Sequence, residues 1–221
     1  MHLTWDLPLD PDGVAGTLED GTAFVIRPLR PTDGPALEAS FEHLSPRSRY
    51  LRFFAARERL GPELLESLIN IDHDRHRAWV VSDPTAPSDI GSDEGRGVAI
   101  ARLIVIQDEP RVAEASLSVI DEYQGRGFGR LLLELLIGTA RDTGVEFIRF
   151  ETLFENRGMR ALLAGLDANR NQELSDREVL VYDVPVDPEE EGQPYGALYE
   201  ILRFIAANDT EDRGEFEEDL R

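Results

Sequence analysis

The stretch VIDEYQGRGFGRLLL, residues 119–133, decides the fold that we predict for this chain. A strand-like segment leads into a glycine-rich turn, and the turn opens directly into a helix with an apolar face. Backbone N–H groups and the positive end of the helix dipole therefore converge on one spot that favours an anion. Three glycines let the main chain approach a pyrophosphate closely, namely Gly125, Gly127 and Gly129. Two arginines can add charge-assisted hydrogen bonds, namely Arg126 and Arg130.

The spacing of this motif excludes two common phosphate-binding loops. No Lys-Ser or Lys-Thr pair follows the glycines, as the nucleoside-triphosphate loop requires. The motif also falls late in the chain, whereas a dinucleotide fold carries its glycines after the first strand. The sequence therefore predicts a pyrophosphate site of another kind.

The segments on either side of the motif alternate in the manner of a mixed α/β sheet. Short β-branched or alternating runs predict strands at residues 22–29, 78–81, 97–106, 111–120, 145–153 and 179–186. Helical spacing and capping signals predict helices at 33–44, 46–56, 129–143 and 156–165, and a further helix that begins at Gly61-Pro62. We divide the chain into an irregular N-terminal arm (1–20), one domain (21–186) and an acidic C-terminal extension (187–221) with a helix at 195–207.

Composition excludes several chemistries. The chain has no Cys, so it forms no disulfides, no thiolate metal sites and no cysteine acyl-enzyme. The net charge of −21 repels phosphate backbones and argues against nucleic-acid binding. No apolar run is long enough to span a bilayer, and the first residues lack the pattern of a secretory signal. We therefore expect a cytoplasmic protein with no membrane partner.

The acidic composition itself has two interpretations. All 23 basic residues are Arg, against 44 acidic residues. The interpretation that we favour is a halophilic protein, because high salt screens a dense acidic surface. The other is electrostatic steering of a cationic substrate, such as an amine or a Lys-rich protein surface. Composition alone does not separate the two.

At this point the chain resembles the GNAT acetyltransferases, whose signature Gln/Arg-x-x-Gly-x-Gly/Ala stands here as QGRGFG at 124–129. A second element, NRGMRAL at 156–162, resembles the stretch that contacts the CoA arm in that family, although its Asn also suits a helix N-cap. The resemblance covers residues 22–186. It implies the GNAT acyl-CoA N-acyltransferase fold, an α/β (α+β) architecture with a mixed, mostly antiparallel sheet flanked by helices. It further implies acetyl-CoA as cosubstrate, bound by Leu117, Val119, Gln124, Gly125, Arg126, Gly127, Phe128, Gly129, Arg130 and Asn156.

Within that superfamily, residues 43–54 (HLSPRSRYLRFF) and 112–115 (VAEA) resemble bacterial Pat-type protein-lysine acetyltransferases. The resemblance implies that Glu114 is the general base. The strand pattern is consistent with this role, because Glu114, Ser116 and Ser118 alternate with apolar residues and form one polar face. Such a face suits a cleft, although a strand face in contact with solvent would show the same pattern.

The mechanism implied is direct transfer of acetyl to a primary amine, with a protein lysine favoured as acceptor. The carboxylate of Glu114 would take the ammonium proton, and a backbone N–H near Val119 would polarise the acetyl carbonyl. In this family a tyrosine often donates a proton to the leaving thiolate, and the matching position in this chain is Leu163. Either CoA leaves as a thiolate, another group such as Tyr182 serves, or the domain is catalytically weak and acts as an acetyl-CoA sensor or interaction module.

Two further clusters could bind metal, and we assign neither of them this role. His73 and His76 lie in a charged loop, where a histidine is most often solvated. Residues 167–178 fill the oxygen-ligand positions of an EF-hand loop. However, Gln172 replaces the turn glycine, and residues 179–182 predict a strand where an exiting helix is required.

Overall fold

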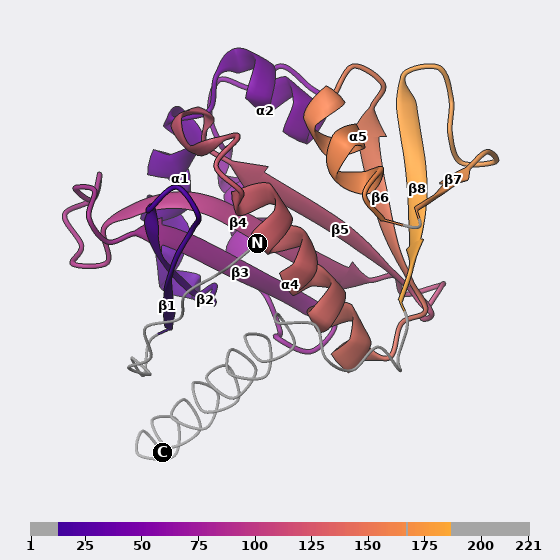
Figure 1. Cartoon of the computed structure of the whole chain (residues 1–221), viewed down its shortest axis with the longest axis horizontal. Coiled ribbons are helices and arrows are strands. Elements are labelled where there is room, and N and C mark those ends of the chain that lie inside the picture. The colour runs from indigo at the N-terminus through magenta and orange to yellow at the C-terminus, as the bar shows by residue number, and fades with distance from the viewer. Residues whose placement is uncertain (1–12, 167, 187–221) are drawn as a thin grey trace.

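The computed structural model describes residues 13–166 and 168–186, and its centre is an eight-stranded sheet (Figure 1). The strand order is β1-β2-β3-β4-β5-β6-β8-β7. Their bounds are β1 (Val14–Thr17), β2 (Ala23–Pro28), β3 (His76–Asp83), β4 (Arg96–Val105), β5 (Val112–Val119), β6 (Phe147–Leu153), β7 (Asn169–Asn171) and β8 (Val179–Pro185). Neighbouring strands are antiparallel except for β5 and β6, which are parallel. The predicted mixed, mostly antiparallel sheet is confirmed.

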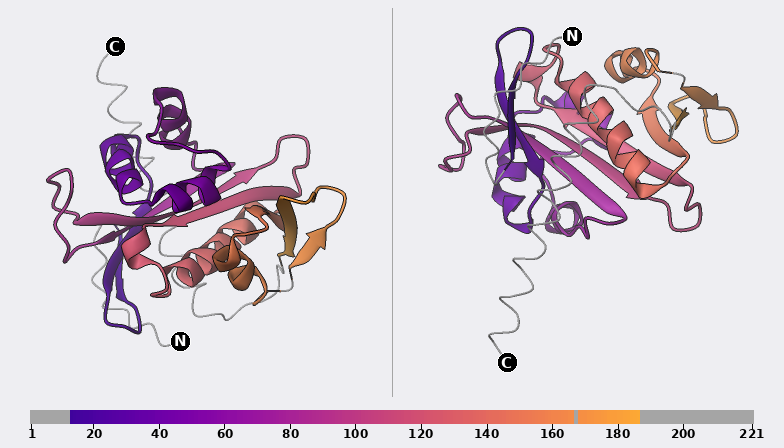
Figure 2. Two further views of the ribbon diagram at one scale, coloured as in Figure 1. Left: turned by 90° about the horizontal axis from the view of Figure 1, so that it is seen from above. Right: turned by 60° about the horizontal axis from the view of Figure 1, so that its bottom comes forward.

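Helices cover both faces of the sheet (Figure 2). The helices are α1 (Gly34–Glu42), α2 (Pro46–Phe53), α3 (Pro62–Ile69), α4 (Phe128–Thr143) and α5 (Arg157–Leu163), with two 3-10 turns, η1 (Pro31–Asp33) and η2 (Asp121–Tyr123). One face carries α1, α2 and α3, and the other carries α4 and α5. The predicted cap of α2 is present, since the Ser45 side chain accepts a hydrogen bond from the Ser48 N–H, whereas Asp33 at the start of α1 makes no such capping bond.

The main core lies between α4 and the strands β4 and β5. Four leucines of α4 are fully buried there, namely Leu131, Leu132, Leu135 and Leu136. Each contributes about 1.5–3 kcal/mol by leaving water. Trp79 of β3 fixes the position of α4 along the sheet, because its Nε1 donates to the hydroxyl of Thr139 at 3.0 Å. The apolar spacing that predicts α4 therefore also places its first turn beside the end of β5.

The N-terminal region differs from the prediction. Residues 14–17, expected to be irregular, form β1 and pair with β2 from Val14↔Ile26 to Thr17↔Ala23. The reason lies in Gly16, where a Cβ atom would come within 2.5 Å of the Phe24 ring. An aromatic ring that covers a strand glycine stabilises a strand that propensity alone would miss. The helix expected at 195–207 lies outside the described residues.

No helix in the described part of the chain is both long enough and apolar enough to cross a membrane.

Candidate active site

The sheet splits between its two parallel strands. β5 and β6 pair only over Val112↔Phe147, Ala113↔Ile148 and Glu114↔Arg149. Beyond Glu114, β5 continues to Val119 along β4, while β6 diverges toward α5 (Figure 1). Within the described residues, the 115–119 segment therefore has a strand neighbour on one side only.

Backbone groups of β5 point into this split. The Ile120 N–H donates to Val98 O, and Ile106 N–H donates to Val112 O, so the even-numbered residues of β5 direct their peptide groups toward β4. Because these groups alternate along a strand, Leu117 and Val119 direct theirs toward the split. The side chain of Gln124 reaches the same edge, where its Nε2 donates to Val119 O at 3.0 Å.

The glycine-rich turn has the backbone conformation that its residues suggest. Gly125 and Gly127 have φ of +77° and +110°, in the left-handed region that favours glycine. α4 begins at Phe128, and its first amides have no acceptor within the helix. A Cβ atom at Gly129 would lie 3.0 Å from Leu162 of α5, so this glycine lets α5 approach the start of α4.

The side chains around this turn have different roles. Arg126 stacks on Tyr123, with 4.8 Å from guanidinium to ring centre, and Arg130 pairs with Glu134 at 2.8 Å. Phe128 is only 1% exposed and packs edge-on against Phe24 and Tyr123. Its side chain therefore anchors the turn in the core, which leaves only the backbone of Phe128 for a ligand.

Asn156 caps α5, because its Oδ1 accepts from the Met159 N–H at 3.1 Å. The side-chain amide nitrogen is not needed for this cap. Leu163, at the position where the resemblance leads us to look for a tyrosine, is 1% exposed and belongs to the core. Tyr182 of β8 is partly buried against the same core.

Glu114 lies on the opposite face of the sheet from α4. Its neighbours Ala113 and Ala115 are buried, whereas Glu114 itself is exposed. Arg52 of α2 reaches the same polar row, where its Nη2 donates to the Ser116 hydroxyl at 2.8 Å. Burial lowers the pKa of Arg52, and the negative charge of Glu114 partly opposes this effect. The predicted polar face of β5 thus carries the acidic Glu114 and borders a basic side chain, Arg52.

Glu151 of β6 is a residue that our sequence reasoning missed. Two positions beyond Arg149 on the same strand, it lies on the face of Glu114 and across the split from it. Burial raises the pKa of Glu151, and the charge of Glu114 raises it further, while Arg149 opposes both effects. The alternation in residues 147–153 could have revealed it, since Ile148 and Phe150 are buried and Glu151 is exposed.

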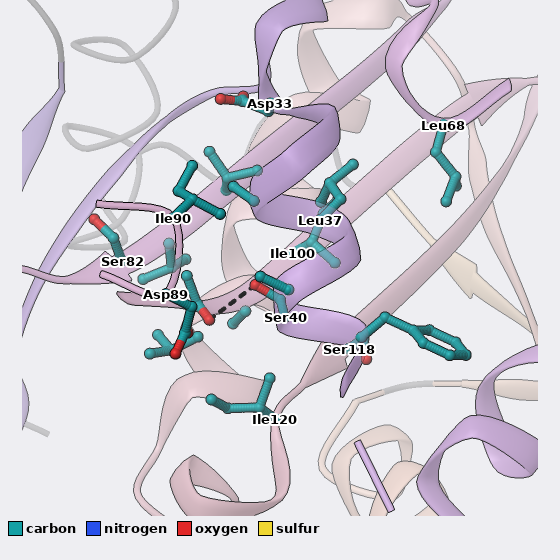
Figure 3. Close-up of a pocket in the computed structure, with 18 of the residues that line it drawn as sticks. Asp33, Leu37, Ser40, Leu68, Ser82, Asp89, Ile90, Ile100, Ser118 and Ile120 are labelled. Carbon is teal, nitrogen blue, oxygen red and sulfur yellow. Dashed lines mark hydrogen bonds between the residues drawn. The ribbon is translucent and has the colours of Figure 1, made fainter. Parts of the chain in front are cut away.

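A cavity of about 290 Å³ lies beneath α1 on the same face as Glu114 (Figure 3). Leu37 and Ile100 form apolar walls, and Ser116 and Ser118 extend the polar row of β5 into it. The loop at 84–95 forms one side, where Glu94 is held by Arg27 and by Arg30. This face of the sheet is therefore hollowed beside Ser116 and Ser118 of β5.

The two metal candidates are not supported. His76 contacts Arg102 at 2.6 Å, and burial together with the charge of Arg102 lowers the pKa of His76 to about 4. Strand β8 begins at Val179, where an EF-hand needs a helix, and the Asp176 carboxylate accepts the N–H groups of Glu178 and Val179. No group of three acidic or histidine side chains in the described ranges could hold a metal ion.

Comparison with known proteins identifies this arrangement. The sequence model of the "Acetyltransferase (GNAT) family" matches residues 48–167, which include β5, β6 and the glycine-rich turn. This chain belongs to the GNAT family. The predicted acetyl-CoA-dependent N-acetyltransferase is thereby confirmed, and acetyl-CoA is the cosubstrate of the family.

Two acetyltransferases and one solved GNAT domain are also similar to this chain. An acetyltransferase of Pseudomonas aeruginosa is 31% identical over 152 residues, which are 68% of this chain and 77% of the relative. The acetyltransferase Pat of Mycolicibacterium smegmatis is 29% identical over 192 residues, 84% of this chain. The chain spans 55% of the length of that Pat. The GNAT domain of Streptomyces lividans PAT superposes with a TM-score of 0.69 at 23% identity, over 81% of this chain and 99% of that domain.

The residues of the split suit a GNAT cosubstrate. Thr152 of β6 is 1% exposed, and within the described residues its hydroxyl has no hydrogen-bond partner. The backbone groups of Leu117 and the N–H of Val119 face the other side of the split, and the glycine-rich turn lies at its end. An elongated molecule with amide groups and a pyrophosphate could satisfy all three features.

Proposed function

We propose that this GNAT enzyme transfers acetyl from acetyl-CoA directly to a primary amine, with Glu114 as general base. The observation that carries the proposal is the position of Glu114. It is the last residue of β5 that pairs with β6, so its carboxylate lies at the rim where the split opens. A base at this point can reach an amine that approaches from the face of α1–α3 while the cosubstrate occupies the split.

Each group of the chain has a defined task in this proposal. The Glu114 carboxylate takes a proton from the ammonium, directly or through water, and the freed lone pair can then form the amide bond. The acetyl–sulfur bond breaks as that bond forms, and CoA leaves as a thiolate, since the buried Leu163 stands where a tyrosine would act as acid. The second proton, which the nitrogen loses as it becomes an amide, goes to that thiolate directly or through water. An N–H at Leu117 or Val119 polarises the acetyl carbonyl, because these groups face the split. The amide of Asn156 and the turn at 125–130 hold the cosubstrate.

A protein lysine is the acceptor that we favour. The Pat-like stretch at 43–54 includes α2, whose Arg52 borders the polar row of β5. Glu114 is exposed, so a side chain from a protein surface can approach it. The net charge of −21 would also steer a cationic partner toward it.

A catalytically weak domain that senses acetyl-CoA is the second candidate, and Leu163 is the observation that favours it. Calorimetric titration with acetyl-CoA, followed by detection of free CoA after addition of a lysine-containing peptide, separates the two. Binding with CoA release supports the transferase. Binding without release, for a panel of peptide and small amines, supports the sensor, and failure to bind contradicts both.

We also propose that the acidic composition is an adaptation to high salt. The titration above is therefore run in molar salt and in low salt. Loss of the native circular dichroism spectrum on dialysis to low salt is the expected result. An unchanged spectrum would favour substrate steering as the reason for the charge.

A further inference from the structure

We propose that Glu151 is a second carboxylate of the acceptor site, which selects a protonated amine together with Glu114. The two residues would hold the ammonium from opposite sides of the split before Glu114 removes its proton. This inference rests on the proposed transfer to an amine and goes beyond it, because it names the feature that makes the acceptor site specific for a cation.

The geometry of the sheet places the two carboxylates on one face. Glu114 pairs with Arg149, and the next side chain of β6 on that face belongs to Glu151. Because the ladder between β5 and β6 ends at Glu114↔Arg149, Glu151 lies on the diverging side of the split. β6 is held there by β8 through Glu151↔Val181, so the position of Glu151 is fixed by the sheet.

The charges around the pair leave room for a cation. Arg149 is already bound to Asp183 at 2.8 Å and to Glu109 at 3.2 Å. Arg52 interacts electrostatically with Glu114, but its Nη2 donates to Ser116, and within the described residues it forms no ion pair with Glu114 or Glu151. Burial raises the pKa of Glu151, and the negative charge of Glu114 raises it further. An ammonium group between the two carboxylates would relieve the repulsion between them, whereas a neutral acceptor would not.

Thr152, next to Glu151, is an independent indication that a ligand binds beside this part of β6. Thr152 points to the face of α4, as do the buried Ile148 and Phe150. Its hydroxyl is buried and, in the described ranges, unpaired, which costs free energy unless a ligand completes it. The same level of β6 therefore offers Thr152 to the cosubstrate on one face and Glu151 to the acceptor on the other.

The test compares three variants of the full chain: Glu151→Gln, Glu151→Asp and the control Glu146→Gln. Glu146 is exposed, pairs with Arg111 just before β6 at the end where β5 and β6 are joined, and loses the same charge when changed to Gln. Initial rates are measured with the amine that gives the fastest CoA release from the wild type. Acetyl-CoA affinity is measured by calorimetry, and the acetylated product, which is neutral at the same nitrogen, serves as inhibitor.

For Glu151→Gln we expect KM for the amine to rise about tenfold or more, since loss of a hydrogen bond between two charged groups commonly has this effect. The Kd of acetyl-CoA and the inhibition constant of the neutral product should stay within about twofold. Glu151→Asp should recover part of the loss, and Glu146→Gln should behave as the wild type.

Two results would overturn the inference while the proposed function stands: an unchanged KM in Glu151→Gln, or equal weakening of the amine and the neutral product. Equal weakening would show a change of shape in place of a lost charge interaction. If the wild type releases no CoA with any amine, the proposed function itself fails and the inference falls with it. The two failures are therefore distinguishable.

Discussion

Glu114 of β5 and Arg149 of β6 form the last residue pair that joins the two parallel strands at the centre of the sheet. Three pairs are enough to align the strands, and in the five residues of β5 that follow, alternate peptide groups face the split and can meet a ligand. This single change from pairing to divergence places Glu114, Glu151 and the backbone of Val119 around one opening.

Replacing Glu114 with Gln should lower kcat/KM for acetyl transfer by about 10²–10⁴-fold, because the isosteric amide cannot accept the ammonium proton. Acetyl-CoA affinity should stay within about twofold, since Glu114 faces away from the α4 side of the sheet. Stopped assays of CoA release and calorimetry measure the two quantities. Glu66→Gln, an exposed change on α3, is the control. Full activity in Glu114→Gln would remove Glu114 from the mechanism.

Gly127→Ala should destabilise the fold by about 1–2 kcal/mol, because a side chain at φ +110° strains the backbone. It should also weaken acetyl-CoA binding, since the strain distorts the turn before α4. Gly144→Ala, at φ +71° on the other end of α4, should cost similar stability and leave affinity unchanged. Urea unfolding and calorimetry on both variants check this. Equal affinity in the two variants would mean that the turn does not hold the cosubstrate.

Features encoded within a short stretch of sequence can be predicted, whereas features that depend on a neighbouring strand cannot. The turn at 124–129 and the leucine spacing of α4 are local, so both were predicted correctly. β1 was missed because Gly16 lacks strand propensity, and its contact with the Phe24 ring exists only once β1 pairs with β2. Glu151 was missed because its proximity to Glu114 depends on the pairing of β6 with β5. The alternation of β6 places it on a face, but only the three-residue ladder to β5 brings it near Glu114.

His76 makes the stability of the protein depend on pH. Burial and the charge of Arg102 lower its folded-state pKa to about 4, although Asp72 opposes this and His73 adds to it. A lowered pKa means that the unfolded chain binds the proton more readily. The contribution of His76 is therefore complete above about pH 6.5 and is lost as pH falls toward about 4. We expect a loss of about 1–2 kcal/mol, because the ring is partly exposed and water screens it.

The measurement for His76 is the free energy of unfolding by urea at several pH values between 4 and 8. His76→Gln keeps a hydrogen-bond acceptor for Arg102 and has no titration in this range. The difference between wild type and variant should shrink as the pH falls. A constant difference would show that His76 does not titrate with folding.

Asp33→Ala should destabilise the protein by about 3–5 kcal/mol, because it leaves a buried guanidinium without its bidentate partner. Arg27 donates to both carboxylate oxygens of Asp33 at 2.8 Å. Burial lowers the pKa of Arg27, but the bonds to Asp33 and Glu94 outweigh it and raise that pKa overall. Thermal unfolding checks this. The control is Asp93→Ala, which removes an exposed carboxylate next to Glu94. A small loss in Asp33→Ala would mean that Glu94 alone satisfies Arg27.

The split between β5 and β6 also bears on how fast the enzyme can work. Free CoA carries the same pantetheine arm and pyrophosphate as acetyl-CoA, so it would occupy the same backbone edge and the same turn after each transfer. Every turnover must then undo most of the contacts that binding made. We expect CoA to inhibit competitively against acetyl-CoA, and its departure to limit the rate once the acceptor is saturating.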